Sequence, residues 1–257
     1  MAGFLSRLKS GDATMRGPAV KDRFPLRDED DPRVLYVLSD RARRISIKVK
    51  TADREVHVVV PGLRALKKAQ SFAKEQRDWI NVQLETLPPP MPFTPGQTIL
   101  FQGQDYQLLS PAGTGRPKIN RATHKIIVPS PDPESFPGRV RRLLIREARE
   151  ELTAASHHYA DKLGKTVGKV SVRDQSSRWG SCITRNGEGH ISYSWRLICA
   201  PPFVLEYVAA HECAHLVHDD HSKAFWDCCH SIFDEVKPAT KWLNKNGATL
   251  HAIGAEF

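Results

Sequence analysis

A stretch without lysine or arginine near the end of the chain constrains the fold most strongly. No lysine or arginine occurs between Arg196 and Lys223, and residues 201–218 begin with two prolines. Proline suits the first turn of a helix, where its missing donor costs little. The residues that follow, among them Val204 and Val208, repeat at helical spacing. Because a helix without a basic face is poorly suited to solvent, this segment predicts a buried helix.

Two histidines and a glutamate on this helix have a spacing that suits a metal ion. His211 and His215 are one turn apart on the same stripe as the valines, so both imidazoles can point at a single ion. Glu212 follows His211 directly and can reach a water on that ion. A His-Glu-x-x-His string is expected by chance only roughly 0.02 times in a chain of this composition. The spacing therefore predicts a zinc site with Glu212 as its catalytic residue.

A third ligand has to come from outside this pair, because a catalytic zinc ion usually takes three protein ligands and keeps one position open. Asp219-Asp220 is expected to end the helix, and Ser222 to cap a new helix running through Val236. Chain reversal there would bring His221 to the metal, whereas His218 is the rival ligand. Three acidic residues farther along are weaker candidates: Asp227, Asp234 and Glu235.

Composition indicates a globular chain that does not depend on disulfides. With 257 residues, roughly 70 to 75% of the unfolded surface can be buried. The longest apolar runs, such as residues 56–60, are far shorter than the ~18 residues of a membrane helix, so no membrane partner is expected. Five cysteines without a Cys-x-x-Cys pair indicate reduced thiols, and the first residues lack a secretory signal. We therefore expect a cytoplasmic protein.

The formal net charge of +9 raises the question of a polyanionic partner. The basic residues form short clusters at residues 41–44, 67–68 and 139–142. Nucleic acid requires a concentrated basic face rather than a surplus of charge. A solvated face is the simpler interpretation of each cluster, and a binding patch stays open.

The first half of the chain is β-rich. Residues 1–32 lack hydrophobic periodicity, which predicts a flexible arm. The segments 34–38, 45–49 and 56–60 are β-branched and largely alternating, which predicts a meander or hairpin. Apolar residues at three- and four-residue spacing from Leu66 to Leu84 then predict one amphipathic helix. Short strands are expected at residues 98–101, 106–109 and 125–128.

The second half is mostly helical. Prolines and a glycine between residues 129 and 138 indicate a boundary, and an apolar stripe over residues 139–159 predicts a helix. A strand pair at residues 170–172 and 190–195 precedes the buried helix. The expected class is α+β: a flexible arm (1–32), a β-rich subdomain with one helix (33–137) and a mostly helical catalytic domain (138–257).

Five sequence elements together resemble the YgjP-like metallopeptidases, which are minimal gluzincins similar to the SprT and Wss groups of proteases that act on DNA-protein crosslinks. The elements are residues 177–182, 190–197, 200–202, 211–215 and 221–226. The resemblance implies a zincin-like catalytic half that acts on a peptide or protein. It implies that His211, His215 and His221 bind one zinc ion and that Glu212 is the acid/base, and thereby favours His221 over His218.

The zincin resemblance also implies a peptide substrate lying along an edge strand beside the active-site helix. The alternating segment 191–195 is the candidate strand. Tyr193, Arg178 and His218 are candidates to stabilise the oxyanion or bind the substrate. Trp179 is interpreted equally as a substrate contact or as a core residue in a structural turn.

Two other functions fit the same sequence. The net charge and the arginine clusters allow a metal-dependent hydrolase of nucleotide phosphoanhydrides at the same site. They also allow a nucleic-acid-binding protein, or a protease that acts on DNA-bound proteins, for which binding to DNA would fall steeply with salt.

Overall fold

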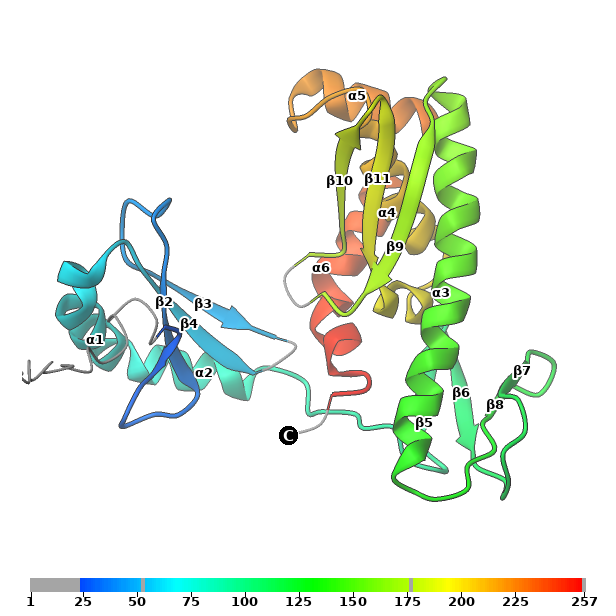
Figure 1. The fold of residues 1–257 in the computed structure, drawn as a ribbon, viewed down its shortest axis with the longest axis horizontal. Coiled ribbons are helices and arrows are strands. Elements are labelled where there is room, and N and C mark those ends of the chain that lie inside the picture. The colour runs from blue at the N-terminus through cyan, green and yellow to red at the C-terminus, as the bar shows by residue number, and fades with distance from the viewer. Residues whose placement is uncertain (1–23, 52–53, 176–177, 256–257) are drawn as a thin grey trace, which may run out of the picture. The chain divides into compact units, whose positions relative to one another are not determined.

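The computed structural model describes residues 24–51, 54–175 and 178–255 and forms two compact units (Figure 1). The first unit comprises residues 1–49 and 55–80, and the second comprises residues 50–54 and 81–257. Within the described residues, no helix is long and apolar enough to cross a bilayer.

The first unit is built on a four-stranded sheet in the order β1-β2-β4-β3. Its strands are β1 (Leu26–Arg27), β2 (Val34–Leu38), β3 (Ser46–Lys50) and β4 (Glu55–Val60). The expected meander is wrong, because β4 lies between β2 and β3 and runs parallel to β2. The strands β3 and β4 follow one another in the chain and are neighbours in the sheet, as the alternative of a hairpin requires. The central position suits β4, whose alternate valines are fully buried, whereas β3 carries an exposed lysine at the edge.

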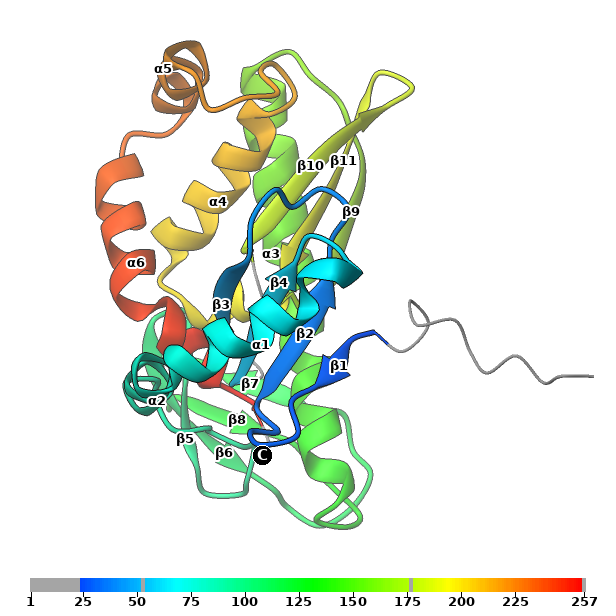
Figure 2. The same ribbon diagram turned by 90° about the vertical axis from the view of Figure 1, so that its left-hand side faces the viewer.

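The helix predicted after this sheet is divided in two. Following a short 3-10 turn, η2 (Leu63–Ala65), α1 spans Leu66–Glu75 and α2 spans Arg77–Glu85, and the two are interrupted at Gln76. Helix α1 lies across the sheet and buries Ala69 and Ala73 (Figure 2).

The predicted flexible arm falls largely outside the described residues, which begin at residue 24. Residues 24–32 include β1, which pairs antiparallel with β2 through Leu26 and Tyr36. The side chain of Asp31 is buried and paired with Arg33.

The second unit packs helices around two small sheets. Its helices are α3 (Ser135–Lys162), α4 (Pro202–Ala214), α5 (Lys223–Ile232) and α6 (Val236–Ala252), with the 3-10 helix η3 (Trp195–Cys199) before α4. One sheet has the order β10-β11-β9, from β9 (Val167–Arg173), β10 (Gly180–Arg185) and β11 (Glu188–Ser194). The other has the order β5-β6-β8-β7, from β5 (Thr98–Phe101), β6 (Gln104–Leu109), β7 (Lys118–Asn120) and β8 (Lys125–Ile127).

Helix α4 is the buried centre of this unit, as its sequence predicts. Val204, Val208 and Ala210 are almost completely buried, together with most other residues of the helix. Helix α3 packs against α4 and β9, and α4 packs against β10 (Figure 1). The same core includes Phe101 and Leu108 of the sheet β5–β8, so these strands pack with the helical region.

The expected α+β class is confirmed, with strands preceding a helical region. The division of the chain into domains after residues 32 and 137 stays a prediction. Ser222 caps α5 as expected, because its side chain accepts a hydrogen bond from the Phe225 amide. Helix α5 ends earlier than expected, at Ile232, since Phe233 is extended.

Candidate metal centre

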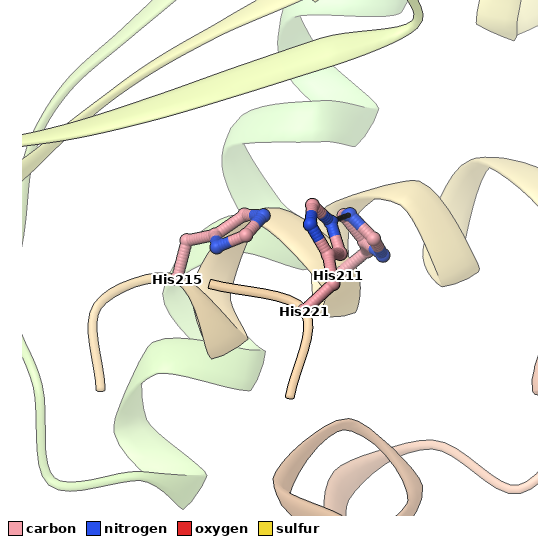
Figure 3. A group of neighbouring side chains, drawn as sticks. All are labelled: His211, His215 and His221. Carbon is pink, nitrogen blue, oxygen red and sulfur yellow. Dashed lines mark hydrogen bonds between the residues drawn. The ribbon is translucent and has the colours of Figure 1, made fainter. Parts of the chain in front are cut away.

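Three histidines from two neighbouring segments meet at the end of α4. His211 lies in the last turn of the helix, and His215 is its C-cap residue. The chain then reverses, and His221 lies one residue before the cap of α5. One ligand nitrogen from each ring lies within 4.8 Å of the others, and the three rings converge (Figure 3).

Two of the three ligand nitrogens have the spacing of donors bound to one metal ion. Nε2 of His211 and Nε2 of His221 are 3.1 Å apart. Two nitrogens bound to a tetrahedral zinc ion, with bonds of about 2.0–2.1 Å, lie about 3.3 Å apart. The donor set fits as well, because three imidazoles are a frequent set for catalytic zinc.

The surroundings of the rings favour the neutral form that a metal requires. Burial lowers the pKa of His211 to about 4, and the neighbouring His215 and His221 contribute in the same direction. Burial also lowers the pKa of His215. At neutral pH both rings therefore hold a lone pair for a metal without first losing a proton.

A backbone carbonyl orients His215. Nδ1 of His215 lies 3.0 Å from the carbonyl oxygen of His218, and because a carbonyl only accepts, Nδ1 carries the proton. Nε2 of the same ring is then the free acceptor, as expected of a metal-binding histidine. His218 thus contributes its main chain here, while its imidazole is not among the three converging rings.

Glu212 lies in a tight space beside the histidines. Its side chain is 5% exposed, and burial raises its pKa to about 8, although the charge of Arg178 lowers it in part. A Cβ atom added to Gly180 would lie 2.4 Å from Oε1 of Glu212 and 2.7 Å from its Cγ. The carboxyl group therefore packs directly against the bare backbone at the start of β10.

An open pocket of about 420 Å³ surrounds these groups. Helix α4 and its following turn supply the histidines, Glu212 and Asp219, and the other wall is Arg178 with residues 180–184 of β10. Strand β10 is an edge strand of its sheet, with β11 on its inner side. Within the described part of the chain, a strand edge without a partner strand therefore borders the pocket.

The strand expected to bind substrate is the wrong one. Segment 191–195 lies mostly in β11, which pairs with β10 on one side and β9 on the other, so its backbone cannot accept a further strand. The structure does not bring Tyr193 to the pocket either. Its ring is fully buried, and its hydroxyl lies 2.9 Å from the Ser156 hydroxyl.

The other predicted substrate contacts differ in position. Arg178 is exposed and lines the pocket. Trp179 stacks on His251 of α6, with ring centroids 4.5 Å apart, and its carbonyl accepts a hydrogen bond from the Ser194 amide. Trp179 therefore anchors the start of β10 to the core, which matches its structural interpretation.

Sequence reasoning missed Asp219 and the part of the pocket wall formed by residues 180–184 of β10. The signal for Gly180 was its place in a strand, where glycine often marks a close approach of another group. Cys182 is two residues farther along the same strand, and burial raises its pKa to about 12. It is therefore a neutral thiol in the wall at physiological pH.

Comparison with known proteins identifies the family. The model of the YgjP-like family, described as a metallopeptidase domain, matches residues 43–246. No curated protein and no solved structure matches the chain. The matched segment includes the three converging histidines, Glu212 and strand β10. The chain belongs to the YgjP-like metallopeptidases.

Proposed function

We propose that this metallopeptidase uses one zinc ion, held by His211, His215 and His221, and that Glu212 is its general base and acid. The observation that carries the proposal is the convergence of three imidazole nitrogens within 4.8 Å, with Glu212 in the same pocket. Zinc bound there would supply a Lewis acid that acidifies water and polarises the scissile carbonyl.

Glu212 would move the proton. A carboxylate oxygen of Glu212 accepts a proton from the attacking water and then donates it to the nitrogen of the departing amine. Glu212 lies in the same pocket as the three histidines, which is the position that a general acid–base group requires. Arg178 at the mouth of the pocket is a candidate to bind the substrate or the developing oxyanion.

Strand β10 is the proposed binding site for the substrate backbone. Its outer edge has no partner strand among the described residues, and residues 180–184 line the pocket. An extended peptide can pair with such an edge through main-chain hydrogen bonds. A peptide bound in this way would lie near Glu212, which packs against Gly180 of the same strand.

The location is proposed from the cysteines. All five thiols are free in the structure, which suits a reducing compartment such as the cytoplasm.

Parallel assays distinguish the peptidase from the nucleotide hydrolase. The zinc-loaded protein is expected to cleave quenched fluorescent peptides and to release no phosphate or pyrophosphate from nucleoside triphosphates above the level of the Glu212→Gln variant. Removal of zinc with a chelator should abolish peptide cleavage, and added zinc should restore it. Hydrolysis of triphosphates that depends on Glu212, without peptide cleavage, would contradict the proposal.

A further inference from the structure

The first unit contains a pocket of its own, with a volume of about 550 Å³. It lies between the chain that follows β2 and the helix α1, and all of its lining comes from residues 43–75. A pocket of this size is within the range of small-molecule and nucleotide sites.

Three cations form the rim of this pocket. Arg43, Arg44 and Lys68 are exposed, and Glu75 is the one acidic residue in the lining. Among residues 24–51, 54–175 and 178–255, none of the three cations forms an ion pair or a side-chain hydrogen bond. Two other arginines of the unit do have such partners, Arg27 with Glu55 and Arg33 with Asp31.

The floor of the pocket is apolar. Ile45, Pro61, Ala65 and Phe72 line it, and each is half-buried, so part of its surface faces the pocket. An aromatic and aliphatic floor within a ring of positive charge is unsuited to a simple anion, which gains nothing from the apolar surface. The pocket suits a ligand that has a flat aromatic ring and a negatively charged group on each side of that ring.

We propose that this pocket binds single-stranded nucleic acid, with a base against Phe72 and the flanking phosphates paired with Arg43, Arg44 and Lys68. Stacking on aromatic side chains and cationic contacts to the backbone are the two components of single-strand binding. A duplex hides its base faces within the stack, and an acidic peptide uses the cations but leaves the apolar floor uncovered. The proposal concerns the first unit and does not depend on the zinc chemistry.

Fluorescence anisotropy of a labelled oligothymidine with the full-length protein tests the site. Charge removal at the pocket (Arg43→Ala, Arg44→Ala and Lys68→Ala together) is expected to weaken binding by more than tenfold at low salt. The slope of log K against log salt should fall by about 2, because each lost phosphate contact on a single strand contributes about 0.7. The matched control removes three exposed charges of the second unit: Arg116→Ala, Lys118→Ala and Lys125→Ala. This control should leave the slope nearly unchanged.

A second variant tests the floor without changing the charge. Phe72→Leu keeps an apolar side chain but removes the aromatic face, so affinity should fall about tenfold with an unchanged salt slope. Equal weakening by the two charge variants would overturn the proposal, as would absence of binding at low salt. Displacement of the oligonucleotide by polyglutamate, duplex DNA or anionic vesicles as effectively as by unlabelled oligothymidine would also overturn it.

Discussion

Replacement of Glu212 by glutamine is expected to lower kcat by about 10²- to 10⁴-fold, the usual contribution of a general acid–base group. Glutamine has nearly the same shape and fits the space beside Gly180, but it cannot accept the proton of the attacking water. Zinc content should stay unchanged, because Glu212 is not one of the three converging ligands. Metal analysis and peptide kinetics on the same preparation measure both quantities.

The matched control is Glu206→Gln, an exposed glutamate of the same helix outside the pocket lining. It should keep the kinetics of the unmodified protein. Full activity of Glu212→Gln would contradict the proposed mechanism. Loss of both zinc and activity in Glu212→Gln would instead indicate that Glu212 is a zinc ligand.

Alanine at position 180 is expected to lower kcat/KM by about 100-fold, since a misplacement of roughly 1 Å can cost that much. The added Cβ would lie 2.4 Å from Oε1 and 2.8 Å from Cδ of Glu212, so the carboxyl group has to move away from the reacting water. The histidines are untouched, and zinc content should therefore stay the same. Peptide kinetics and metal analysis of Gly180→Ala measure this effect.

Two comparisons separate this displacement from a general loss of structure. Gly115→Ala adds a methyl group whose nearest neighbour, Cγ of Pro129, lies at 3.4 Å, and it should leave activity unchanged. Gly180→Ala combined with Glu212→Gln should be no slower than Glu212→Gln alone, because both changes act through one carboxyl group. A further loss of activity in the double variant would show that Gly180→Ala does not act through the carboxyl group of Glu212.

The parts of the site that follow from local periodicity could be predicted from the sequence. The helical turn between His211 and His215 is a property of the α-helix, and the missing basic residues indicated its burial. His221 could not be distinguished from His218 by spacing alone. The path of the chain between α4 and His221 depends on backbone hydrogen bonds after α4, such as the one from the His218 amide to the Ala214 carbonyl. These bonds belong to the folded chain and leave no sequence pattern.

The wall of the pocket was harder to predict. Strand β10 has few β-branched residues and an irregular burial pattern, and it is held by pairing with β11 rather than by its own propensity. Tyr193 could have been placed correctly, because strand alternation puts it on the same face as the buried Ile191. The order of β2, β4 and β3 depends on which strands pair in the folded sheet, which is a tertiary property.

Zinc binding by the unmodified protein and by His218→Ala and His221→Ala tests the central claim most directly. Alanine at 218 keeps the carbonyl that orients His215, whereas alanine at 221 removes a ligand. The account predicts about one zinc ion per chain in the unmodified protein and in His218→Ala. Since loss of an outer partner alone costs about 10- to 100-fold in affinity, His221→Ala should bind zinc more weakly still. Unchanged zinc affinity in His221→Ala, or loss of zinc in His218→Ala alone, would contradict it.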